Sequence, residues 1–212
     1  MTRYDERTPQ IWKVPLRDQI APDVTVEAPR GGYLVPAAQA ALVADTLRLH
    51  GITFQTLTQA DNRAVQSFRA DTATFAARSN EGHQGLAVSG QWRAETRAVP
   101  AGSLFVPITQ PKARLVMAIL EPQAPDSLLQ WGLFNLAFER KEYMEDYVAE
   151  DVAREMLARD PALKAQFEQR LASDPAFAAD PQARLEFFYR LHPSWDERYR
   201  LYPVLRTDQS AF

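Results

Sequence analysis

Two carboxylates lie close together in the stretch LEPQAPDSLLQWGLFN, from Leu120 to Asn135. Glu121 and Asp126 are five residues apart, and a pair of carboxylates can share acid and base work, as in glycosidases. The chain would then be a metal-independent hydrolase that uses Glu121 and Asp126. The alternative is a structural corner, in which Pro122 and Pro125 end one helix and Asp126 caps the next. We favour the corner, because carboxylates at this spacing are common.

Two tryptophans raise a third hypothesis, a stand-alone module that binds a small ligand in a groove between sheet and helices. Trp131 lies in the corner and Trp195 in an aromatic C-terminal tail, HPSWDERYRLYPVLR. The candidate binding residues are therefore Trp131, Glu121, Asp126 and Trp195, and no residue is assigned a catalytic role. In the structural alternative, Trp131 and Phe134 fix the corner to a sheet, and the tail packs onto helices.

The histidines do not suggest a metal site. His50, His83 and His192 are the three histidines, and none begins the His-x-x-Glu spacing of carboxypeptidase-type zinc sites. His50 follows a predicted helix, where it is expected to help cap the last carbonyl groups. The chain has no cysteine, which excludes thiolate ligands and disulfides. We expect no metal and no cofactor in this chain.

Composition narrows the choice of partners. The net charge is −3 with both signs interspersed, whereas nucleic-acid binding needs a concentrated basic face. No apolar run is long enough to span a membrane. The first residues, MTRYDERTPQIWKVPLRDQI, are charged and contain no apolar signal-peptide core. We therefore expect neither nucleic acid nor membrane as a partner, and the localisation stays open.

Prolines and glycines divide the chain. Residues 1–30 hold regularly spaced prolines and are expected to form an extended lead-in or linker, with Trp12 and Ile20 as anchors. Residues 31–110 are predicted to form a βαβ unit, with a locally parallel strand pair, followed by three or four strands. The first helix should begin at Pro36 and end at Gly51. Turns are expected near Gly82, Gly90 and residues 100–102.

Residues 111–212 are predicted to be helical and continuous in one domain with residues 31–110. KARLVMAIL is one short helix, and one long helical stretch or two should follow Asp126. Three further helices should begin at Asp-Pro pairs, since Asp caps free N–H groups and Pro suits the first turn. The predicted core stripe of the long helix is Met144, Val148, Val152 and Met156. Glu142, Asp146 and Glu150 lie on one face of this helix. We favour a solvated face, and the alternative is a site for a cation or a basic partner.

The predicted fold class is therefore α+β. An N-terminal βαβ unit merges into a mixed sheet, and a C-terminal set of helices packs on that sheet.

Four segments together resemble the C-terminal region of large bacterial zinc carboxypeptidases of the carboxypeptidase A type. The most distinctive words are LEP-x-x-PDSL-x-x-WG and the HGI that follows the first helix. The resemblance covers nearly the whole chain. Its segments are YLVPAAQAALVADTLRLHGITFQTL, GSLFVPITQPKARLVMAILEPQAPDSLLQWGLFN, FERKEYMEDYVAEDVAREMLARDPALKAQF and RLEFFYRLHPSWDERYRLYPVLR.

The resemblance implies a non-catalytic accessory domain that stabilises a catalytic domain or shapes access to its cleft. The zinc ligands, the general base and the substrate-binding arginine of that family belong to the catalytic domain, and no segment here matches their motifs. The implied partner is a carboxypeptidase catalytic domain, in cis or in trans, and the implied zinc belongs to that parent enzyme. An exported parent would place the chain in the periplasm or outside the cell.

Overall fold

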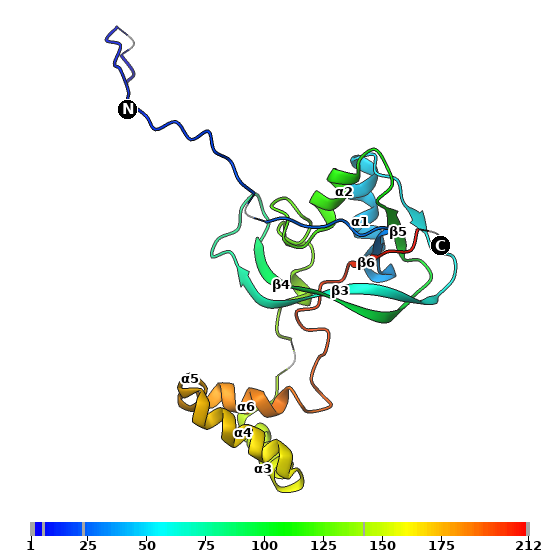
Figure 1. The fold of residues 1–212 in the computed structure, drawn as a ribbon, viewed down its shortest axis with the longest axis vertical. Helices are drawn as coiled ribbons and strands as arrows, with labels where there is room; N and C mark the ends of the chain where they lie inside the picture. Colours follow the sequence, from blue (N-terminus) through cyan, green and yellow to red (C-terminus); the bar gives the residue numbers. More distant parts are fainter. Residues whose placement is uncertain (1–2, 6, 23, 142, 211–212) are drawn as a thin grey trace.

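The computed structural model describes residues 3–5, 7–22, 24–141 and 143–210. It is an α+β structure, in which two helices pack on a six-stranded sheet and four more form a separate group (Figure 1). The strand order is β2-β5-β1-β6-β3-β4, and every pair is antiparallel. The strands are β1 (Gly32–Val35), β2 (Gln55–Thr56), β3 (Asp61–Phe75), β4 (Leu86–Val99), β5 (Leu104–Pro107) and β6 (Leu205–Thr207). The helices on the sheet are α1 (Ala37–Leu49) and α2 (Ala113–Leu120).

Strand β1 lies in the middle of the sheet and is buried on both faces. Tyr33 and Val35 point into the large core beneath α1 and α2, and Leu34 points into a smaller core on the opposite face. Helix α1 contributes Val43 and Leu47 to the large core. As predicted, α1 begins after Pro36 and ends just before Gly51. Gly51 has a φ of +61°, a value that glycine adopts readily.

The predicted mixed sheet with a parallel strand pair is wrong. A β-α-β start is present, but β5 lies between β1 and β2 and is antiparallel to both. Leu104 and Val106 of β5 contribute to the large core and Phe105 contributes to the small one. A strand with apolar side chains on both faces fits a middle position in a sheet. β2, only two residues long, is left at the edge.

Strands β3 and β4 form a long hairpin with a register shift between Ala70 and Thr72. Gly90 was predicted to mark a turn, but it lies inside β4 opposite Ala70. A Cβ atom at Gly90 would lie 2.2 Å from the carbonyl oxygen of Arg69. This glycine therefore allows a close backbone approach next to the irregularity.

The C-terminal tail returns to the sheet, where β6 inserts between β1 and β3. The prediction that the tail packs back onto helices is therefore wrong for its last part. Leu205 lies in the small core, and its neighbour Arg206 is buried on the other side. This alternation of sides is what a central strand requires.

The corner after α2 does not begin a long helix. Asp126 is exposed, and its side chain accepts no hydrogen bond from the described residues. Ser127 Oγ instead accepts one from the Gln130 N–H, at 3.2 Å. The turn ends at Gly132, whose φ is +81°. A backbone of this kind interrupts a helix, and the next α-helix begins only at Asp146.

Helices α3 (Asp146–Arg159), α4 (Pro161–Ser173), α5 (Pro175–Ala179) and α6 (Pro181–Tyr189) pack on one another, set apart from the sheet (Figure 1). The prediction that the C-terminal helices pack on the sheet is wrong for these four and holds for α2. Their own aromatic cluster explains the separation, since it buries apolar surface without the sheet. It consists of Phe167, Phe177, Phe187 and Phe188, with ring centroids 4.8–6.0 Å apart.

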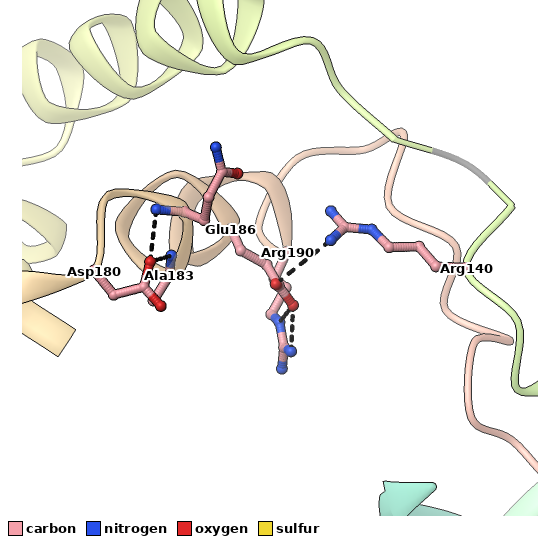
Figure 2. Close-up of polar contacts among 6 residues, drawn as sticks. Arg140, Asp180, Ala183, Glu186 and Arg190 are labelled. Atoms are coloured by element: carbon pink, nitrogen blue, oxygen red, sulfur yellow. Dashed lines mark hydrogen bonds and ion pairs between the residues drawn. The ribbon is translucent and has the colours of Figure 1, made fainter. Parts of the chain in front are cut away.

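The predicted Asp-Pro helix starts are confirmed. Asp160, Asp174 and Asp180 each accept hydrogen bonds from backbone N–H groups in the first turn of the following helix. Figure 2 shows Asp180 in this role at the start of α6. The core stripe predicted for α3 is shifted: Met144 precedes the helix and Val148 is exposed, while α3 buries Ala149 and Ala153.

The three acidic residues predicted to share one face of the long helix have different surroundings. Glu142 lies outside the described residues, Asp146 accepts a hydrogen bond from Gln182 on α6, and Glu150 pairs with Arg154.

Residues 7–22 are exposed and extend away from the sheet (Figure 1). Trp12 is 78% exposed and Ile20 94% exposed, so the predicted anchors do not hold this segment on the part of the chain that the structure describes. Ile11, Val14 and Leu16 are exposed as well. We call residues 7–22 the N-terminal arm.

Candidate functional site

Glu121 is the centre of a buried polar network rather than a solvent-facing acid. Its carboxylate accepts two hydrogen bonds from the Arg206 guanidinium, of 2.9 Å from Nε to Oε1 and 2.5 Å from Nη2 to Oε2. The hydroxyl of Tyr33 donates to Oε1 at 2.5 Å. Glu121 is 3% exposed and Arg206 7% exposed. A bidentate guanidinium–carboxylate pair with an added phenol satisfies a charge that would otherwise be costly to bury.

The fold explains how these three side chains meet. Tyr33 on β1 and Arg206 on β6 are cross-strand partners, so their side chains lie next to each other on one face of the sheet. Glu121 directly follows α2, where the backbone turns to an extended conformation. The network therefore joins the first strand, the last strand and the end of α2.

Aromatic rings enclose the network. The Arg206 guanidinium carbon lies 4.1 Å from the centroid of the Trp92 ring, within cation–π range. The hydroxyl of Tyr202 donates to the Leu120 carbonyl at 2.9 Å and satisfies the end of α2. Burial, and then the negative charge of Glu121, raise the pKa of Tyr33 far above its usual range, and burial does the same to the pKa of Tyr202. Both phenols therefore stay protonated as hydrogen-bond donors.

Asp126 does not belong to this network. Its side chain is exposed and has no hydrogen-bond or ion-pair partner among the described residues. Glu121, in contrast, uses both carboxylate oxygens within the core. The geometry thus places one carboxylate in a closed structural network and leaves the other on the surface.

Trp131 packs against the protein together with two other residues of the corner. Its half-buried ring lies edge-on to His83, with the centroids 5.4 Å apart. Phe134 is buried against Tyr202, also at 5.4 Å. Asn135 donates its side-chain N–H to the Gln84 carbonyl at 2.9 Å. Trp131 and Asn135 therefore attach the corner to the loop between β3 and β4, and Phe134 attaches it to the C-terminal segment.

Trp195 lies at a different place and lines a cleft. Its half-buried ring packs edge-on to Tyr189 and Tyr199, with centroids 5.1 and 6.0 Å away. Arg190 lies over it, 5.5 Å from the ring centroid. The cleft has a volume of about 530 Å³ and lies between the β3–β4 hairpin and the segment 190–201. Of the four candidate binding residues, Trp195 is the one that lines it.

The described residues offer no grouping of three or more histidine, cysteine, aspartate or glutamate side chains that could hold a metal ion. In the same part of the chain, we find no helix with the length and apolar character needed to cross a membrane.

Comparison with known proteins identifies no relative: no family model, curated protein or solved structure matches the chain.

Sequence reasoning found Glu121 but missed its partners Tyr33 and Arg206. One signal was available, because a glutamate between an apolar helix and a proline needs a cation if it is buried. The tail supplies such a cation directly after an apolar run, as Arg206 in PVLRT.

Proposed function

We propose that this chain is a non-catalytic accessory domain of a zinc carboxypeptidase-like protein. In this role it stabilises a catalytic domain or shapes access to the cleft of that domain. The resemblance in sequence suggests the partner, and the uncovered apolar side chains of the N-terminal arm carry the proposal.

The arm is unusual for a surface segment. Ile11, Trp12, Val14, Leu16 and Ile20 are between 71% and 94% exposed within a short stretch. Contiguous exposed apolar side chains of this kind mark sites where another protein surface binds. The prolines at 9, 15 and 22 favour an extended conformation, which lowers the entropy lost on binding.

The setting of Glu121 favours this role over the hydrolase alternative. An acid that accepts hydrogen bonds from both Arg206 and Tyr33 and is 3% exposed is held away from substrate. The corner around it then serves to hold the sheet and α2 together.

The proposal is tested by capture of the protein from its source cells with an antibody against this chain. We expect zinc and carboxypeptidase activity to be captured with it. For a partner bound in trans, a tagged variant with Trp12, Leu16 and Ile20 changed to serine should lose the captured activity. The matched control changes Arg17 and Gln19 of the same arm to alanine and should retain it. Capture of the wild-type chain without carboxypeptidase activity would contradict the proposal.

A further inference from the structure

The cleft at Trp195 collects positively charged side chains from two parts of the chain. Strands β3 and β4 supply Arg69 and Arg97, and the segment 190–201 supplies Arg190 and Arg198. Asp196 and Glu197 also line the cleft. Four arginines therefore face two carboxylates, in a chain whose overall charge is negative.

Three of the arginines already have partners within the chain. Arg69 donates to the carbonyls of Tyr199 and Glu197, at 3.0 and 2.7 Å. Arg190 pairs with Glu186, which also faces Arg140 at 3.6 Å (Figure 2). Arg97 uses Nε to contact Glu95, at 2.6 Å.

Arg198 remains available to a ligand. Its side chain is exposed, and it has no hydrogen-bond or ion-pair partner among the residues that the structure describes. The terminal nitrogens of Arg97 also lack a hydrogen-bond partner within that part of the chain. Asp196, two residues before it, accepts a hydrogen bond from the Arg198 backbone N–H at 2.9 Å rather than from its guanidinium. Within the described part of the chain, the Arg198 guanidinium and the terminal nitrogens of Arg97 are thus available to bind a ligand.

The segment that carries Arg198 is held firmly on β3. In addition to the two bonds from Arg69, the backbone N–H of Ala70 donates to the Arg200 carbonyl at 2.9 Å. The backbone N–H of Tyr202 donates to the Phe68 carbonyl at 2.9 Å, and Arg200 donates from its side chain to the Asp71 carbonyl at 2.9 Å. Because this backbone is already fixed, ligand binding has to order only the Arg198 side chain, which lowers the entropy lost on binding.

A second cavity, of about 680 Å³, shares Arg97, Asp196, Arg198 and Leu201 with the first. The shared residues make the two cavities neighbouring parts of one groove. The second cavity adds apolar walls: Leu34, Pro36, Pro100, Leu136, Pro203 and Leu205. A ligand that fills both parts needs an anionic head and an apolar body.

We propose that this groove binds a small organic anion, whose carboxylate or phosphate head is held by Arg97 and Arg198. The planar guanidinium matches both kinds of head through paired hydrogen bonds. The apolar body of the ligand lies against the walls formed by Pro100 and Leu136. This site is independent of the arm, and it exists whether or not the chain serves a peptidase.

The experiment titrates the full chain with benzoate and with phenyl phosphate, each compared with potassium chloride at equal ionic strength. The readout is the indole N–H signal of Trp195 in NMR spectra, identified by its loss in Trp195→Phe. We expect saturable shifts at millimolar concentrations. Arg198→Gln and Arg97→Gln should each weaken binding by about tenfold or more. Arg114→Gln, an exposed arginine of α2 that does not line the groove, should bind as wild type.

The two probes also distinguish the sources of the anion, because tighter binding of phenyl phosphate indicates a phosphate ester and tighter binding of benzoate a carboxylate. The proposal is overturned if neither probe shifts the Trp195 signal beyond the salt control. It is equally overturned if Arg198→Gln and Arg97→Gln, folded as judged by their spectra, bind the probes like wild type.

Discussion

The carboxylate of Glu121 and the guanidinium of Arg206 form a buried bidentate ion pair between residues 85 positions apart. This pair joins the end of α2 to the strand that closes the middle of the sheet. Tyr33, the cross-strand neighbour of Arg206, completes it. We infer from this network that Glu121 stabilises the fold, and the first prediction concerns its substitution.

Glu121→Gln should therefore destabilise the fold, because it leaves the Arg206 charge buried without its counter-charge. We expect a loss of about 3–5 kcal/mol in the free energy of unfolding, measured by urea denaturation. Asp126→Asn is the matched control, and its exposed side chain should change stability by less than about 0.5 kcal/mol. A Glu121→Gln protein of wild-type stability that loses a hydrolytic activity would instead support the acid–base hydrolase.

Stability should fall steeply in alkaline solution because of Tyr33 and Tyr202. Both phenols have pKa values raised above the usual value of 10.0, for Tyr33 through burial and then the Glu121 charge, and for Tyr202 through burial. Above that pH the unfolded chain releases these protons while the folded chain keeps them, so each phenol lowers stability by about 1.4 kcal/mol per pH unit.

Tyr33→Phe removes one of these two phenols. Its unfolding free energy between about pH 10.5 and 11.5 should fall less steeply than that of wild type, by about 1.4 kcal/mol per pH unit. Denaturant unfolding at a series of pH values measures the two slopes. Equal slopes would show that Tyr33 titrates normally in the folded protein.

Gly132 should not tolerate a side chain. Its φ of +81° favours glycine, and a Cβ atom would lie 2.4 Å from the Gln84 carbonyl oxygen. Gly132→Ala should lower the thermal midpoint, through a destabilisation greater than about 1 kcal/mol. Gly82 offers a control, because it also has a positive φ, of +81°, but no atom lies within 4 Å of its added Cβ. A smaller loss in Gly82→Ala would separate the steric contact from backbone strain, and equal losses would contradict the role of Gln84.

Asp180 should stabilise the group of helices α3–α6 through its side chain. It accepts hydrogen bonds from the N–H groups of Gln182 and Ala183, at 2.9 and 3.1 Å. Asp180→Ala should cost about 1 kcal/mol, whereas Asp180→Asn should retain most of the stability because asparagine caps equally well. Hydrogen exchange of α6 amides measures the effect locally. If both variants lost the same amount, charge rather than capping would be responsible.

Local signals in the sequence predicted several elements well. The Asp-Pro pairs identified the starts of α4, α5 and α6, because a capping side chain and a fixed φ act within one turn. Pro36 and Gly51 bounded α1 for the same reason. These signals depend only on residues that are neighbours along the chain.

Non-local pairing could not be predicted in the same way. Nothing near β1 or β2 reveals that β5 lies between them, and nothing near Arg206 shows that it meets Glu121. The predicted cap of the corner was wrong, because Ser127 rather than Asp126 accepts the hydrogen bond from the turn. The groove also escaped prediction, since Arg97 and Arg198 come from distant parts of the chain. The strand order, the Glu121–Arg206 contact and the groove all depend on chain topology. The periodicity of the sequence does not specify that topology.

The central proposal is that the chain works as an accessory domain of a zinc carboxypeptidase-like protein. The most direct measurement is the size of the native protein in its source cells, by immunoblot and by native gel with the same antibody. We predict that the antigen runs well above 24.0 kDa in at least one of these gels, together with zinc and carboxypeptidase activity. An antigen that runs at 24.0 kDa in both gels, without zinc or carboxypeptidase activity, would contradict the account.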